Sequence, residues 1–161
     1  LVLADALAWG IETYKPVAVV DLATLTGGVV VALGSSTAGV FSNNDELFAE
    51  VSRCAEKCGE SIWRLPLLDA VRDLIKSDTA DVVNSAGRNA SPVQGATFLS
   101  HFVPDGTPWM HMDIAGVADT DKELPYYGKG ATGFGVRTLV EWIRERARPA
   151  VTHAMPRVAG G

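Results

Sequence analysis

The stretch that most constrains the fold is an apolar, β-branched run, Val17–Val20, followed at once by the polar and glycine-containing segment Asp21–Gly28. A run without polar alternation is typical of a strand buried on both faces, as in a mostly parallel sheet. The threonines and glycines that follow indicate a strand end and a loop. Because ligands of open α/β sheets bind beyond the carboxyl ends of the strands, this loop is either a simple turn or the edge of a site.

Helical and extended patterns alternate along the rest of the chain. Apolar spacing predicts helices over residues 1–14, 44–59, 67–77, 93–103 and 136–148. Residues 27–34 could form either a helix or a loop, because the stretch contains glycines. Extended runs are predicted at 17–22, 37–42, 61–67 and 109–116, with a short strand and a loop within 80–95 and a long glycine-rich loop over 117–135. The predicted fold class is therefore α/β, a mostly parallel or mixed sheet flanked by helices. We expect one domain over residues 1–148 and a disordered tail over 149–161.

Composition excludes several classes of protein. The net charge of −5 argues against a nucleic-acid partner, whose binding groove would be basic. No apolar run approaches the roughly 18 residues that a membrane span needs, and we expect no membrane association. Two cysteines and no signal-peptide pattern are typical of a cytoplasmic protein.

The helical stripe of the first segment is already running at Leu1, and no capping residue precedes it. We therefore expect the chain to be a fragment of a longer protein.

Cys54 and Cys58 lie four residues apart on a predicted helix, so both fall on one face. Half of a metal site is one interpretation, but no second pair of ligands has suitable spacing nearby. A disulfide between them has poor geometry on a helix. Two reduced cysteines on a packed helix is the favoured interpretation.

Other catalytic and binding motifs are absent or ambiguous. The chain has no phosphate-binding glycine loop, no G-x-S-x-G and no H-E-x-x-H. His111 alternates with methionines on an extended run, which favours a packed histidine over a ligand. His101 and His153 are scattered, and Asp78 and Asp81 suit capping or turn roles better than metal ligation.

Five segments together resemble the C-terminal half of the catalytic domain of the cytosolic leucyl aminopeptidases, the M17 family of dinuclear-metal peptidases. They span nearly the whole chain in the family's order and read LVLADAL, VVDLATLTGG, AGVFSNNDEL, SDTADVVNSAGR and the stretch from MDIAGV to LPYYGKGATGFGVRTLVEWI.

The resemblance implies a metallo-aminopeptidase that releases N-terminal amino acids from peptides, leucine preferred, and assembles as a homo-hexamer in the cytoplasm. It implies two divalent cations (Mn, Zn or Mg), together with bicarbonate, in the full-length parent. The family's metal ligands lie on segments upstream of the position of Leu1, including the signature N-T-D-A-E-G-R. We therefore expect no catalytic or metal-binding residue in this chain, and no metal bound to it alone.

The resemblance also implies which residues contact the substrate. In the family, main-chain groups of the loop that matches Thr24, Leu25, Thr26 and Gly27 hydrogen-bond the peptide, the leucine carbonyl above all. The pocket for the N-terminal side chain maps onto Thr24, Gly27, Ala115 and Ala118. Glycines allow a backbone to approach a ligand closely, which agrees with this role. Asp21 is expected to be structural.

One segment departs from the family pattern. Where many members read G-G-R-G-A-G-S-I-T-A, this chain has Ala86–Gly95, with Asn89, Ser91 and Pro92 in place of small residues. This loop neighbours the active site in the family. Which residues the enzyme prefers on the leaving side of the cleaved peptide bond is therefore an open question. Two alternatives to an aminopeptidase segment stay open: a catalytically inactive fragment or structural module, and a nucleotide-binding α/β domain, which would need the missing phosphate loop.

Overall fold

We describe the protein from a computed structural model that covers residues 1–123, 125 and 128–148. The tail predicted over 149–161 lies outside the described residues.

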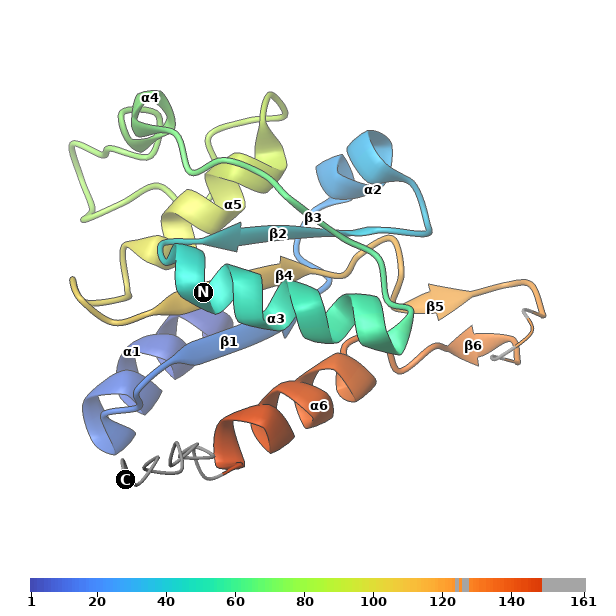
Figure 1. The fold of residues 1–161 in the computed structure, drawn as a ribbon. Helices are drawn as coiled ribbons and strands as arrows, with labels where there is room; N and C mark the ends of the chain where they lie inside the picture. Colours follow the sequence, from blue (N-terminus) through green and yellow to red (C-terminus); the bar gives the residue numbers. More distant parts are fainter. Residues whose placement is uncertain (124, 126–127, 149–161) are drawn as a thin grey trace, which may run out of the picture.

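The centre of the fold is a four-stranded sheet in the order β1-β4-β2-β3 (Figure 1). Its strands are β1 (Val19–Ala23), β2 (Ala38–Ser42), β3 (Ile62–Arg64) and β4 (Trp109–Asp113). β1 pairs with β4 in parallel and β2 with β3 in parallel, whereas β2 and β4 are antiparallel. The prediction of an α/β fold with a mostly parallel or mixed sheet is confirmed, and the sheet is mixed.

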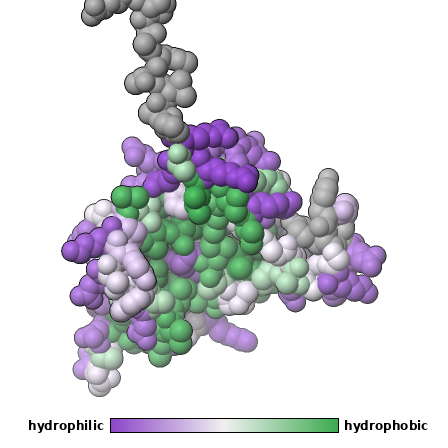
Figure 2. Space-filling model, turned by 90° about the horizontal axis from the view of Figure 1, so that it is seen from below, coloured by the Kyte–Doolittle hydropathy of each residue, from purple (hydrophilic) through white to green (hydrophobic). Residues whose placement is uncertain are grey.

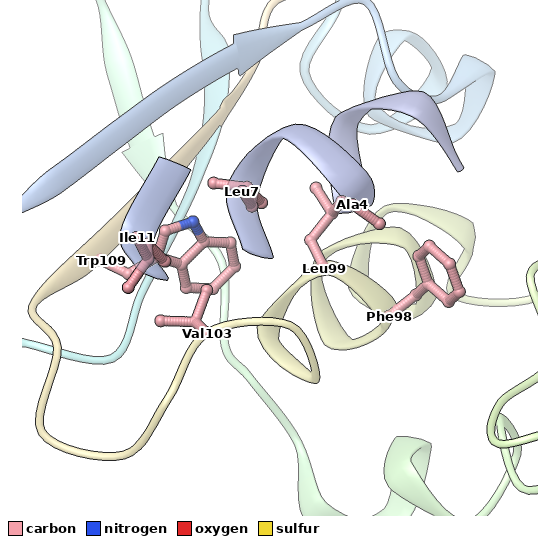
Figure 3. Packing of buried hydrophobic residues seen from close by; sticks show 7 residues of the cluster. All are labelled: Ala4, Leu7, Ile11, Phe98, Leu99, Val103 and Trp109. Carbon is pink, nitrogen blue, oxygen red and sulfur yellow. The ribbon is translucent and has the colours of Figure 1, made fainter. Parts of the chain in front are cut away.

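Helices cover both faces of this sheet. On one face, α1 (Val2–Tyr14) and α5 (Ser91–Ser100) form an apolar cluster with Trp109 of β4 (Figure 3). On the other face, α3 (Asp45–Cys58) and α6 (Val136–Ala147) enclose Met110 and Met112. Because side chains alternate across a strand, Trp109 and the two methionines necessarily serve opposite faces.

The structure contains both helix caps that the sequence indicates for α3. The Asn44 side-chain oxygen accepts the Leu47 N–H at 2.8 Å, and Gly59 ends the helix with φ 68°. Cys54 is buried and Cys58 half-buried, and both thiols are free. The interpretation as reduced cysteines on a packed helix is confirmed, and burial raises the pKa of the Cys54 thiol.

α6 is fixed at its N-terminus by Glu60, which follows α3. This buried carboxylate accepts the N–H groups of Gly135 at 3.1 Å and Thr138 at 3.2 Å, and the Thr138 hydroxyl at 2.5 Å. It thereby satisfies donors that have no partner inside the helix, and it places a negative charge at the positive end of the helix dipole.

Three local predictions are wrong, and a fourth stretch was left open. The helix predicted over 67–77 is reduced to one turn, α4 (Asp69–Arg72), because only Val71 and Ile75 of its apolar residues are buried and a single turn needs tertiary packing to persist. Within the described part of 80–95 there is no strand. The predicted loop over 117–135 contains a small hairpin, β5 (Asp119–Thr120) with β6 (Gly130–Ala131), and 27–34 is largely helical, as α2 (Gly27–Leu33).

Candidate functional site

The loops after β1 and β4 lie side by side because these two strands are parallel neighbours. Ala23 and Asp113, the last residues of the two strands, are direct partners in the register. The chain after β1 therefore leaves the sheet beside the chain after β4. This is the edge of the sheet at which α/β proteins bind ligands.

The carboxylate of Asp113 holds both loops. One oxygen accepts the N–H groups of Leu25 at 3.1 Å, Thr26 at 3.4 Å and Ala115 at 3.2 Å, and the other accepts the Thr26 hydroxyl at 2.7 Å. Asp113 is only 1% exposed. Hydrogen bonds to a carboxylate are among the stronger ones in proteins, so this single side chain sets the position of the two loops relative to each other.

Thr26 then begins the next helix. Its hydroxyl oxygen accepts the Val29 N–H at 3.2 Å, which is the usual arrangement of an N-cap threonine. Thr26 thus donates to Asp113 and accepts from α2 through one atom. The loop is fixed at both ends, and its backbone is preorganised.

A second loop leads into the start of α5, and this segment, Ala86–Gly95, packs against the first loop at two glycines. A Cβ on Gly28 would lie 2.2 Å from the Ser91 hydroxyl and 2.7 Å from Pro92 Cδ. A Cβ on Gly95 would lie 2.9 Å from Leu25 Cδ2. The Pro92 ring cannot move aside, so glycine is required at Gly28, whereas a side chain at Gly95 would displace the flexible end of Leu25.

The buried Gln94 organises the Ala86–Gly95 loop. Its side-chain oxygen accepts the Ala86 N–H at 3.2 Å, and its side-chain nitrogen donates to the Asn89 carbonyl. The three residues that depart from the family pattern, Asn89, Ser91 and Pro92, lie in or next to the loop that this glutamine holds.

Two hollows border the loop after β1. One, of about 450 Å³, is lined in part by Leu25, Thr26, Gly27, Ser91 and Gln94. The other, of about 1000 Å³, is lined in part by Gly27, Gly28, Asn89, Ser91 and Pro92. Gly27 and Ser91 contribute to both, so the predicted substrate loop and the departing loop share two cavities.

The six predicted site residues are placed as follows. Leu25, Thr26 and Gly27 line the smaller hollow, and Leu25 is 36% exposed. Thr24 is exposed beside them, and Ala115 is tied to the same carboxylate as Leu25 and Thr26. Ala118 lies in the turn after β4, where its carbonyl accepts the Thr132 N–H at 3.0 Å.

Asp113 is the residue that sequence reasoning missed. It is the last residue of β4, two residues before a turn. The signal that could have revealed it is a carboxylate at the end of an apolar run that forms a buried strand, because a buried carboxylate requires several hydrogen-bond donors.

Asp21 is structural, as expected. It is buried in β1, where one oxygen accepts the Trp109 indole N–H at 2.7 Å and the other lies 2.5 Å from His111 Nδ1. His111 is fully buried and stacks between Phe41 and Trp109. The interpretation of His111 as a packed histidine is confirmed.

The remaining candidates do not belong to this site. Asp78, Asp81 and His101 are exposed, and His153 lies outside the described residues. Among the residues that the structure describes, no group of three or more histidine, cysteine, aspartate or glutamate side chains is placed to hold a metal ion. No helix in the described ranges is long and apolar enough to cross a membrane.

Comparisons with known proteins identify the family. The model of the cytosol aminopeptidase family, catalytic domain, matches residues 1–140. A probable cytosol aminopeptidase of Chloroherpeton thalassium is 51% identical over 144 residues, which cover 89% of this chain and 28% of the relative. One of Dinoroseobacter shibae is 48% identical over 145 residues, covering 90% and 30%.

Solved structures agree with this result. A tomato leucine aminopeptidase mutant is 43% identical with a TM-score of 0.83, covering 89% of this chain and 27% of that one. The bottromycin maturation enzyme BotP in complex with Mn is 43% identical with a TM-score of 0.83, covering 91% and 33%. The chain spans less than a third of the length of these two curated relatives. It belongs to the cytosol aminopeptidase family, whose catalytic-domain model matches its residues 1–140.

Proposed function

We propose that this chain supplies the substrate-cleft loops of a metallo-aminopeptidase that releases N-terminal amino acids from peptides, with leucine preferred. The observation that carries the proposal is the Asp113 carboxylate, which joins the loops after β1 and β4 within a segment of a peptidase catalytic domain. A structural neighbour named leucine aminopeptidase supports the preference for leucine.

In this proposal, the backbone between Thr24 and Gly27 contacts the peptide. Asp113 accepts the N–H groups of Leu25 and Thr26, so these donors hold the loop and are not available to a ligand. The Leu25 carbonyl is then the group that we assign to a substrate N–H. A backbone dipole held in this way orients a ligand without reorganisation.

Small residues form the proposed pocket for the N-terminal side chain. Thr24, Gly27, Ala115 and Ala118 occupy little volume, and a Cβ on Gly27 would meet nothing within 4 Å. Such a wall leaves room for a side chain of leucine size. Asn89, Ser91 and Pro92 border the neighbouring hollow, where we place the leaving side of the peptide.

We propose two divalent cations, Mn, Zn or Mg, and bicarbonate as cofactors of the full-length enzyme. A similar structure solved in complex with Mn supports metal dependence. The residues described here do not fit a metal: no suitable cluster is present among them, and the four hydrogen bonds to Asp113 occupy its oxygens. We therefore assign the metal ligands and the proton transfers to other parts of the family's polypeptide.

For the enzyme as a whole we propose a cytoplasmic homo-hexamer that acts on peptides, without a nucleic-acid or membrane partner.

The alternative function, an inactive fragment or assembly module, applies to the 161 residues in isolation. We expect the purified chain not to hydrolyse leucyl amide, with or without added Mn²⁺ or Zn²⁺. A chimera tests the proposal itself: the 144 matched residues of the Chloroherpeton thalassium relative are replaced by those of this chain. We expect the chimera to hydrolyse leucyl amide. Robust turnover by the isolated chain, shown by intact-mass spectrometry to be a single species, would contradict the assignment of catalysis to other segments.

A further inference from the structure

A hollow between α4 and α5 lies apart from the substrate loop. Its volume is about 240 Å³, and it is lined in part by Arg72, Lys76, Asp81, Thr97 and His101. None of its lining residues belongs to either of the two hollows beside the loop after β1. Pockets for drug-sized ligands usually measure about 300–1,000 Å³, so this hollow suits a smaller molecule.

The segment after α4 folds back beside that helix. The Val83 N–H donates to the Ile75 carbonyl at 2.7 Å, which closes the segment between them into a loop. Asp81 of this loop thereby lines the same hollow as Arg72, the last residue of α4. From the sequence, Asp78 and Asp81 suit capping or turn roles equally well. Of the two, the structure brings only Asp81 to the hollow.

The two cations of the hollow are held only by exposed ion pairs. Arg72 Nε lies 3.3 Å from the Asp69 carboxylate, and Lys76 Nζ lies 2.6 Å from the Asp73 carboxylate. All four side chains are exposed. Because exposed ion pairs contribute little to stability, both cations can turn toward a ligand at small cost.

Two other polar groups of the hollow have no partner. Among the residues that the structure describes, the Asp81 carboxylate takes part in no hydrogen bond or ion pair. The Thr97 hydroxyl is likewise unpaired, although Thr97 is only 3% exposed. A buried hydroxyl without a partner costs free energy, so a ligand that bonds to it is favoured.

The position of the hollow favours a small molecule over a protein partner. Large exposed apolar patches are typical of protein interfaces. The molecule has a broad hydrophobic surface on its underside (Figure 2), whereas α4 lies at the top of the view in Figure 1, on the opposite side. The hollow is thus separate from that surface, and its own lining is largely charged and polar.

We propose that this hollow binds a free α-amino acid with an apolar side chain. Arg72 and Lys76 pair with its carboxylate, and Asp81 pairs with its ammonium group. Ile75, which is buried, and Val82, which is half-buried, line the same hollow and contact the apolar side chain. A ligand with both charges uses the cations and the carboxylate together, whereas a simple anion would leave Asp81 opposed to it.

The choice of leucine as the probe rests on the proposed function, which releases this amino acid, but the site itself does not. Binding is measured on the 161-residue chain without turnover. A failure to bind leucine would therefore leave the proposed function intact, and an inactive chimera would leave this inference intact.

The test titrates the isotope-labelled chain with L-leucine and follows the backbone amides by NMR. We expect the amides of Thr97, Ser100 and His101 to shift. Leucinol, which lacks the carboxylate, and N-acetylleucine, which lacks the ammonium group, should each bind at least ten-fold more weakly. Inorganic phosphate should bind more weakly than leucine as well.

Variants then assign each charge. Lys76→Gln should weaken leucine binding at least five-fold, with Lys122→Gln, at an exposed lysine outside the hollow, as its matched control. Asp81→Asn should also weaken leucine binding at least five-fold, but it should not weaken the binding of N-acetylleucine. Asp78→Asn is its matched control and should leave leucine binding unchanged.

Four results would overturn the proposal. One is the absence of any shift of the Thr97, Ser100 and His101 amides at millimolar leucine. A second is a set of shifts confined to Leu25–Gly27, which would place leucine in the cleft instead. A third is phosphate binding as tight as that of leucine, which would indicate a general anion site. A fourth is an equal effect of Asp81→Asn and Asp78→Asn in variants that circular dichroism shows to be folded.

Discussion

The Thr26 hydroxyl donates a 2.7 Å hydrogen bond to the carboxylate of Asp113, across 87 residues of chain. The same threonine oxygen caps α2, and the same carboxylate binds the backbone of Leu25 and Ala115. The ends of two parallel strands and the start of one helix are therefore held by one pair of side chains. The proposed cleft depends on this pair rather than on any catalytic side chain of its own.

Asp113→Asn should lower the free energy of unfolding by about 1–3 kcal/mol, because an amide presents one acceptor where the carboxylate presents two, and its NH₂ group faces a donor. The exchange of the Leu25 and Thr26 amide hydrogens should accelerate. Urea denaturation and hydrogen exchange measure the two effects. Asp105→Asn, at an exposed position in the turn before β4, is the matched control and should change neither.

Gly28→Ala should destabilise the fold by about 1–3 kcal/mol, since its Cβ would overlap Ser91 and Pro92. Thermal or urea unfolding measures the change. Gly10→Ala, on α1 where a Cβ meets nothing within 4 Å, should instead stabilise the chain by about 0.5–1 kcal/mol through helix propensity. Equal effects of the two substitutions would contradict the close packing of the two loops.

Asp21→Ala should lower the free energy of unfolding by about 1–3 kcal/mol, because it leaves the buried Trp109 indole N–H and the His111 ring without their acceptor. In the chimera with the Chloroherpeton thalassium relative, kcat per folded molecule should be unchanged, since Asp21 does not reach the cleft. A large loss of kcat with normal stability would show that Asp21 has a role beyond the core.

Ion pairs between α3 and α6 should make stability depend on acidity. Hydrogen bonds from Lys57 and Arg53 lower the pKa of Glu145 from its ordinary 4.5 to about 2, and a hydrogen bond from Arg146 lowers the pKa of Glu50. A carboxyl with a lowered pKa in the folded state contributes stability above about pH 4.5 and loses it as the pH falls toward 2. Glu145→Gln should therefore reduce this dependence, measured by urea denaturation at several pH values. Glu12→Gln, on the exposed side of α1, should leave it unchanged.

Local sequence patterns predicted most of the fold. The unbroken apolar run of β1, the capping residues of α3 and the alternation of helices and strands each follow from neighbouring residues. The helix predicted over 67–77 failed because its length is decided by how much apolar surface is available to cover it, which is not a local property. The same holds for the β5–β6 hairpin, whose two-residue strands carry too little pattern to be recognised.

The sequence pointed to the candidate site through its loop and not through the residue that holds the loop. Thr24–Gly27 stand out by their glycine and by their place after a buried strand. Asp113 is 86 residues beyond Gly27, and only the parallel register of β1 and β4 brings it to that loop. The sequence of one strand does not reveal its register with another strand, because both strands are mostly apolar and several alignments would bury most of their side chains.

The central claim, that the backbone around Leu25 and Gly27 contacts the substrate, is tested most directly by Gly27→Ala in the chimera with the Chloroherpeton thalassium relative. A Cβ at this helical position meets nothing in the protein, so the stability should be retained. We predict that kcat/KM for leucyl amide falls at least ten-fold, because the methyl group occupies space that the substrate needs. An unchanged kcat/KM in a stably folded variant would contradict the claim.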